Sequence, residues 1–149
     1  MDNYLKEQIE FKLEEIDRLF AEYEAIFNKI KSKEPDLYDK TILASVLHSF
    51  YNGVENIFGL IAKCIDKNLP NGEKSHQELL NQMVIKTKKR DSVITQELYI
   101  KLREYATFRH FYRHSYSFYL DYEKMRNLVE ELNLVYNDFK KEIIEFIEK

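Results

Sequence analysis

The chain contains only 3 glycines and 2 prolines in 149 residues. A β-rich domain of this length needs many tight turns, and glycine and proline are among the residues that build them. Apolar residues make up 44% of the sequence, which supplies enough material for a packed core. The composition therefore predicts a single all-α domain over residues 1–149, built from a few long helices.

Apolar residues recur at intervals of three and four along most of the chain, as on one face of an amphipathic helix. We find no internal repeat and no domain linker, so we expect an up-and-down bundle of four long helices and one short helix. Asp36 is a candidate N-cap, and Ser75 to Glu78 fit a capping box. The expected helices cover residues 3–31, 37–67, 75–83, from Ser92 or Thr95 to about 117, and 121–147.

Charge and cysteine content narrow the class of protein. The net charge of −3 gives no overall attraction to nucleic acid, although it leaves room for a local basic groove. A single cysteine excludes an intramolecular disulfide and a multi-thiolate zinc site. The charged N-terminus does not resemble a signal peptide, and no segment approaches the roughly 18 apolar residues of a membrane span. We expect a cytoplasmic protein without membrane contact, metal ion or cofactor.

The residues best suited to catalysis or phosphate binding lie together between Phe108 and Tyr116. At about 100° per residue, a helix here has one polar side and one side for phenylalanines. Arginine binds phosphate oxygens through a forked, permanently charged group, and histidine transfers protons near neutral pH. The polar side carries Tyr105, Arg109, His110, Tyr112, Arg113, His114 and Tyr116, and the opposite side carries Phe108 and Phe111.

The same pattern also fits a solvated or dimer-facing surface. Arg109 and His114 lie about 140° apart around one helix, so they need not converge within one chain. A symmetric dimer with this face at its interface would bring two copies together and form a composite cleft.

Arg109 to Tyr116 also matches the pattern R-x4-H-x-Y, and this segment resembles the signature of HepT-like toxins in the HEPN superfamily. Residues 47–56, 70–80 and 119–121 are similar to that family as well, so the resemblance covers roughly residues 35–135. It implies an all-α homodimer that acts as a metal-independent endoribonuclease on RNA, with tRNA and mRNA both reasonable substrates. The expected product carries a 2′,3′-cyclic phosphate.

The resemblance also implies roles for individual residues. His114 would act as a general base or acid on a ribose 2′-OH, and Arg109 would stabilise charge on the scissile phosphate. His110 and Arg113 would support them. The partner implied is an MNT-type nucleotidyltransferase antitoxin, which forms a hetero-oligomer with the toxin and transfers AMP to the motif tyrosine, Tyr116. Alternatively, Tyr116 is a dimer-interface residue.

Two further groups of polar residues are candidates for the site. Glu55 belongs to a polar stripe on the second expected helix and could pair with Arg109 or orient a motif histidine; an exposed face or a helix–helix hydrogen bond is the alternative. A basic run precedes the motif helix and is either a solvated loop or a contact for the RNA backbone. This run consists of Lys86, Lys88, Lys89 and Arg90.

A function of a different class is compatible with the same fold. The chain could be a non-catalytic helical subunit that binds substrate for a nucleotidyltransferase, because a fold alone does not decide function. The presence of both Arg109 and His114 favours the enzyme, since a scaffold has no need for both.

Overall fold

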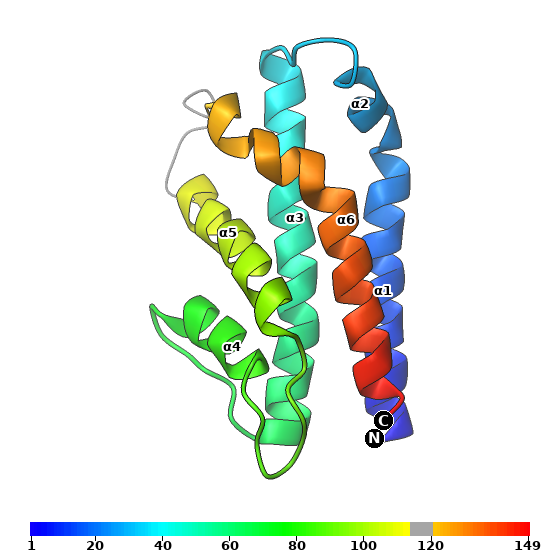
Figure 1. The fold of residues 1–149 in the computed structure, drawn as a ribbon, viewed down its shortest axis with the longest axis vertical. Coiled ribbons are helices and arrows are strands. Elements are labelled where there is room, and N and C mark those ends of the chain that lie inside the picture. Colours follow the sequence, from blue (N-terminus) through cyan, green and yellow to red (C-terminus); the bar gives the residue numbers. More distant parts are fainter. Residues whose placement is uncertain (114–120) are drawn as a thin grey trace.

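The computed structural model describes residues 1–113 and 121–149. Within these ranges the chain forms helices and no strand, which confirms the all-α prediction. Helix α3 stands at the centre of the bundle and contacts α1, α4, α5 and α6, while the two termini lie together at one end (Figure 1). The helices are α1 (Asn3–Glu22), α2 (Glu24–Lys29), α3 (Leu37–Ile61), the π-helical turn η1 (Ala62–Asp66), α4 (Ser75–Met83), α5 (Gln96–Arg113) and α6 (Tyr122–Ile147).

The first expected helix is divided into two. Tyr23 leaves helical geometry with φ −107° and ψ 15°, and α2 starts at the next residue. The apolar spacing continues across this break, so the pattern alone did not reveal it. The change of direction allows Ile26 of α2 to be buried in the core.

Local hydrogen bonds set the start of α3. Asp36 accepts a hydrogen bond from the amide of Asp39 at 2.8 Å, and the Asp39 carboxylate accepts one from the amide of Asp36 at 3.1 Å. This reciprocal capping box confirms Asp36 as the N-cap. At the other end the expected helix 37–67 is present, but its last turn widens into η1 before Lys67 adopts a left-handed φ of 56°.

The predicted N-cap is present in α5 and absent in α4. Thr95 caps α5, since its hydroxyl accepts a hydrogen bond from the amide of Leu98 at 3.2 Å. The predicted capping box of α4 is wrong: Ser75 is already inside the helix, and the cap residue Lys74 makes no side-chain capping bond. The helix itself is present because Leu79, Leu80 and Met83 are buried against the bundle.

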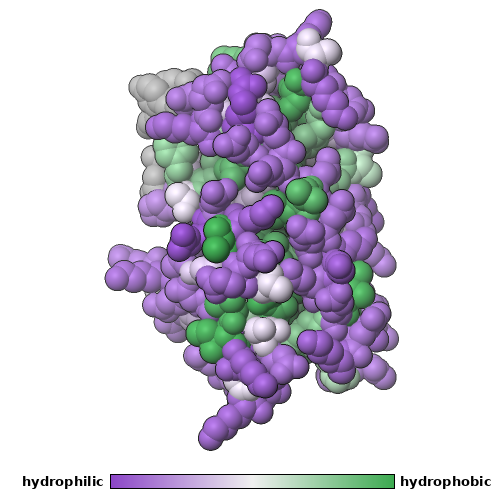
Figure 2. Space-filling model, in the orientation of Figure 1, coloured by the Kyte–Doolittle hydropathy of each residue, from purple (hydrophilic) through white to green (hydrophobic). Residues whose placement is uncertain are grey.

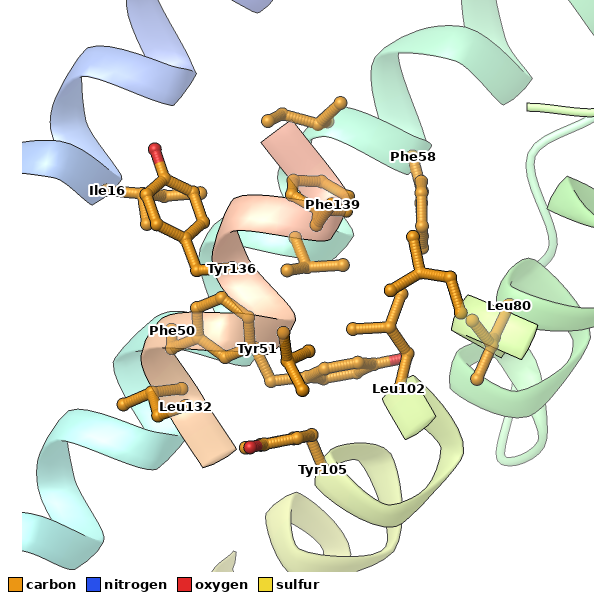
Figure 3. Packing of buried hydrophobic residues seen from close by; sticks show 14 of the residues in the cluster. Ile16, Phe50, Tyr51, Phe58, Leu80, Leu102, Tyr105, Leu132, Tyr136 and Phe139 are labelled. Carbon is orange, nitrogen blue, oxygen red and sulfur yellow. The ribbon is translucent and has the colours of Figure 1, made fainter. Parts of the chain in front are cut away.

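Aromatic rings fill the centre of the bundle (Figure 3). Phe50 packs edge-on against Tyr105 and Tyr136, with ring centroids 5.4 and 6.1 Å apart. The predicted position of Tyr105 on the polar side of its helix is wrong, because the side chain is buried. Only 1% of it is exposed, and its hydroxyl donates a hydrogen bond to the carbonyl of Leu128 at 2.7 Å. That bond satisfies the one polar atom of an otherwise apolar ring.

The outer surface is mostly hydrophilic on the face shown in Figure 2, where apolar side chains form scattered patches. This distribution follows from amphipathic helices that direct their apolar stripes inward. In the described ranges, no helix combines the length and the apolar character needed to cross a membrane.

Candidate functional site

Helix α5 positions the first half of the R-x4-H-x-Y motif. Phe108 enters the core, as expected, and Phe111 is half-buried. Arg109 exposes 11% of its side chain, while His110 and Arg113 are exposed. His114 and Tyr116 lie outside the described residues.

Two side chains of α3 hold the Arg109 guanidinium. Its Nε atom donates a hydrogen bond to Asn52 Oδ1 at 3.2 Å and lies 3.1 Å from Glu55 Oε1. Asn52 and Glu55 are three residues apart on one helix, so they present their polar groups on the same face. The structure thus forms the pairing of Glu55 with Arg109. The two Nη amino groups of Arg109 form no hydrogen bond with any described residue.

The second oxygen of Glu55 is bound by a histidine from a different helix. His76 of α4 places its Nδ1 atom 2.6 Å from Glu55 Oε2. Glu55 exposes only 11% of its side chain, whereas His76 exposes 47%. Sequence reasoning placed His76 in a capping sequence and missed this contact, because nothing in its local pattern indicates a partner 21 positions away.

Asn52 connects the arginine to another histidine and fixes its tautomer. Because Asn52 Oδ1 faces Arg109, the Asn52 amino group faces His48 Nε2, at 3.2 Å. His48 Nε2 must therefore accept, and the proton of the neutral ring lies on Nδ1. Burial lowers the pKa of His48, and the charges of Arg109 and Arg113 lower it further. Its Nδ1 is buried and finds no hydrogen-bond partner in the described ranges.

These side chains form one continuous set, named here the Arg109 network. Its members come from three helices, α3, α4 and α5, and are His48, Asn52, Glu55, His76 and Arg109.

A surface groove of about 590 Å³ runs beside the Arg109 network, between α3 and the start of α4. Arg109, Glu55 and His76 lie on its wall, Lys63 adds a second cation, and Leu69 and Pro70 form an apolar part of the lining. An anion next to Arg109 would find a positively charged group that is already oriented. Among residues 1–113 and 121–149, no group of three or more His, Cys, Asp or Glu side chains is arranged to hold a metal ion.

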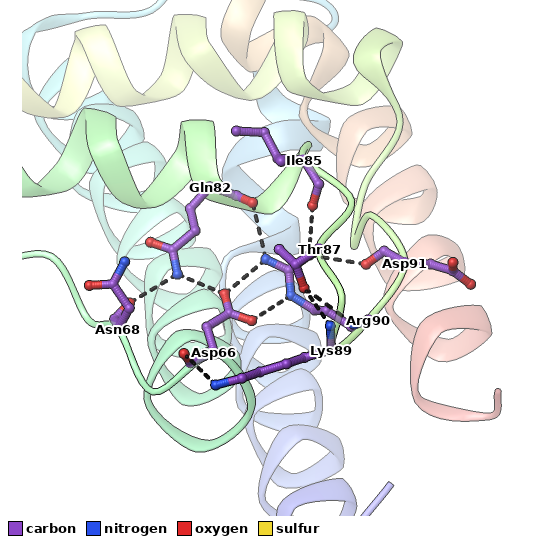
Figure 4. Close-up of polar contacts among 8 residues, drawn as sticks. All are labelled: Asp66, Asn68, Gln82, Ile85, Thr87, Lys89, Arg90 and Asp91. Carbon is purple, nitrogen blue, oxygen red and sulfur yellow. Dashed lines mark hydrogen bonds and ion pairs between the residues drawn. The ribbon is translucent and has the colours of Figure 1, made fainter.

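The predicted basic run is divided by the fold. Lys86, Lys88 and Lys89 are exposed, but Arg90 is buried, with 3% of its side chain accessible. Arg90 forms a bidentate ion pair with Asp66 at the end of η1, at 2.7 and 2.8 Å (Figure 4). Arg90 is therefore part of the internal packing, and its predicted role as a surface RNA contact has no support from its position. Of the four residues in the basic run, the three lysines are surface cations.

A comparison with protein families identifies the family of this chain. The family described as HepT-like protein matches residues 42–149. This chain belongs to the HepT-like family. The matched range includes α4, α5, α6 and nearly all of α3, and therefore every member of the Arg109 network. No curated protein and no solved structure matches the chain significantly.

Proposed function

We propose that this HepT-like protein is a metal-independent endoribonuclease and the toxin of a toxin–antitoxin pair. The observation that carries the proposal is the oriented guanidinium of Arg109, on the helix whose sequence continues into R-x4-H-x-Y. Arg109 binds the scissile phosphate of RNA, and His114 takes the proton of the neighbouring ribose 2′-OH. The 2′ oxygen then attacks phosphorus and the bond to the 5′ oxygen breaks. The 5′ oxygen takes a proton from water and leaves as a hydroxyl, and a 2′,3′-cyclic phosphate remains on the other fragment.

The geometry of Arg109 supports this role. Its contacts with Asn52 and Glu55 involve Nε, which leaves the Nη amino groups for two phosphate oxygens. Because the guanidinium is fixed before substrate arrives, little reorganisation is needed as negative charge develops on the phosphate. His48 Nε2 accepts from the Asn52 amino group, which keeps the Asn52 oxygen directed at Arg109.

The complete site is proposed to form in a homodimer. Positions 109 and 114 are five residues apart in the sequence, which corresponds to about 140° around a regular helix, so the two side chains need not converge within one chain. A two-fold interface along the end of α5 brings the motif of each protomer to a shared cleft. The exposed lysines at positions 86, 88 and 89 then bind flanking phosphates of the RNA.

Control of the enzyme is proposed to act on Tyr116. An MNT-type nucleotidyltransferase transfers AMP to its hydroxyl, in a hetero-oligomer with the toxin. The added phosphodiester introduces negative charge into the motif, where it would compete with RNA for Arg109 and repel the RNA backbone.

A second function is favoured by one feature of the structure. The charge of Arg109 is already balanced by Glu55, as in an ion pair that only joins two helices. In that case the chain is a non-catalytic partner subunit of a nucleotidyltransferase, and the groove beside Arg109 binds the substrate of that enzyme.

Expression of the chain without its partner separates the two functions. The toxin should arrest growth, and Arg109→Ala or His114→Ala should each restore it at equal protein levels. Arg103→Ala is the matched control, because it removes an exposed arginine from the same helix and should leave the arrest unchanged. Normal growth with all four proteins would contradict the proposed toxin function.

Transfer of AMP to Tyr116 is tested separately by intact mass. Incubation with the partner and ATP should increase the mass by one or more AMP units, and Tyr116→Phe should abolish the increase.

A further inference from the structure

We propose that His76 is a positioning residue for Arg109 and acts through Glu55. The inference rests on the proposed function, because it concerns the same arginine. It assigns a role in that function to α4, a helix outside the R-x4-H-x-Y motif.

The carboxylate of Glu55 is held on both sides. Oε1 lies 3.1 Å from Arg109 Nε, and Oε2 lies 2.6 Å from His76 Nδ1. A glutamate has three side-chain torsions, so an ion pair at one oxygen leaves the carboxylate plane able to rotate. A short hydrogen bond at the second oxygen removes that freedom. The position of Arg109 therefore depends on His76 as well as on Glu55.

No other described residue makes this contact. The hydrogen bonds and ion pairs of Glu55 in the described ranges are those with Arg109 and His76. Tyr51 is a candidate alternative donor to Glu55, because the two side chains interact electrostatically. Burial is the main cause of the raised pKa of Tyr51, and the charge of Glu55 raises it further. The Tyr51 hydroxyl is buried and forms no hydrogen bond within residues 1–113 and 121–149, and therefore none with Glu55. Loss of the His76 imidazole would therefore leave Glu55 Oε2 without a donor from the described residues.

The contact suits a positioning role because it joins three separately anchored helices. Helix α4 is packed against α3 and α5 through Leu79, Leu80 and Met83. The side chain of Gln82, also on α4, donates hydrogen bonds to Asp66 at 2.7 Å and to the carbonyl of Asn68 at 2.9 Å. His76 thus projects from a fixed support. Both its neutral Nδ1–H form and its imidazolium can donate to Glu55.

The first test compares His76→Ala with His76→Asn in RNA cleavage. Asparagine carries an amide nitrogen at the δ position and can replace the Nδ1 donor, whereas alanine cannot. His76→Ala should lower kcat by about 10- to 100-fold, the effect of displacing a catalytic group by a fraction of an ångström to one ångström, with KM changed much less. His76→Asn should recover most of kcat. Glu78→Gln, an exposed change on the same helix, is the control.

A double-mutant cycle shows whether His76 acts through Glu55. Glu55→Gln should lower kcat at least as much as His76→Ala, and the double variant should be no worse than Glu55→Gln alone. Independent, multiplying effects would overturn the proposal, as would an unchanged kcat in His76→Ala.

A measurement without RNA keeps this inference separate from the ribonuclease itself. Hydrogen exchange of the Arg109 Nε–H, followed by NMR in the full chain, should be slow in the wild type, faster in His76→Ala and slow again in His76→Asn. Equal exchange rates in all three folded proteins would refute the positioning role even if the wild type cleaves RNA. Slowed exchange in a wild type that cleaves no RNA would refute the proposed function and leave the contact intact.

Discussion

Replacing Arg90 with alanine should destabilise the protein far more than the loss of a surface charge would. All five N–H groups of its guanidinium are used (Figure 4). Two bonds go to the Asp66 carboxylate, and three go to the carbonyls of Gln82, Ile85 and Asp91. The ion pair is nearly inaccessible, with side-chain exposures of 3% for Arg90 and 7% for Asp66.

The size of the stability loss in Arg90→Ala follows from the Asp66 carboxylate, which stays buried without its ion-pair partner. Burial raises the pKa of Asp66, but hydrogen bonds from Arg90 and Gln82 outweigh it and hold the pKa below its ordinary value. Without Arg90 the carboxylate stays in the same poorly solvated position, and among the described residues Gln82 is the one side chain that still donates a hydrogen bond to it. Removing one member of a buried pair costs about 3–5 kcal/mol. At about 2–4 °C per kcal/mol for a domain of this size, Tm should fall by roughly 6–20 °C.

Urea and thermal unfolding of Arg90→Ala and Lys89→Ala provide the assay. Both variants lose one positive charge in the same loop, but Lys89 is exposed and only reaches the Asp66 carbonyl at 3.3 Å. Lys89→Ala should change stability by less than about 0.5 kcal/mol. If Arg90→Ala also lost less than about 1 kcal/mol while RNA binding weakened, Arg90 would be a nucleic-acid contact, which is one of the two interpretations of the basic run, and its burial would not explain its role.

Three other predictions test different parts of the structure. The pKa of His48 is lowered in the folded chain, so the unfolded chain binds the proton first as pH falls through about 6.5. Stability should therefore decrease as pH falls below 6.5, and His48→Gln should flatten that dependence in urea unfolding at several pH values. A Cβ atom at Gly53 would lie 2.8 Å from Ile16 Cγ1, so Gly53→Val should cost about 1–3 kcal/mol, and adding Ile16→Ala should recover part of it. Asp36→Ala should cost about 0.5–2 kcal/mol because it removes a real cap, whereas Ser75→Ala should have no capping cost.

The sequence predicted the features that depend on local pattern. Apolar spacing identified nearly every helix. Asp36 was predicted as a cap and Thr95 as one of two candidate caps, because the bonds of such caps go to residues three positions away. The break at Tyr23 was missed because the apolar period continues through it.

Contacts between residues far apart in the chain could not be predicted from local sequence patterns. Tyr105 was expected on a polar face because it lies about one helical turn before Arg109, but it is buried and the carbonyl of Leu128 accepts a hydrogen bond from its hydroxyl inside the core. Arg90 was grouped with three lysines by charge, although Asp66, 24 positions earlier, draws it inside. The Arg109–Glu55 pair was foreseen as one alternative, while its extension to His76 depends on where α4 packs.

The proposed ribonuclease can be tested by RNA cleavage with the purified protein in EDTA, beside Arg109→Ala and His114→Ala. The wild type should release discrete fragments with 2′,3′-cyclic phosphate ends, and neither variant should release any. An absence of cleavage by unmodified wild-type protein, or equal cleavage by all three, would contradict the proposed function.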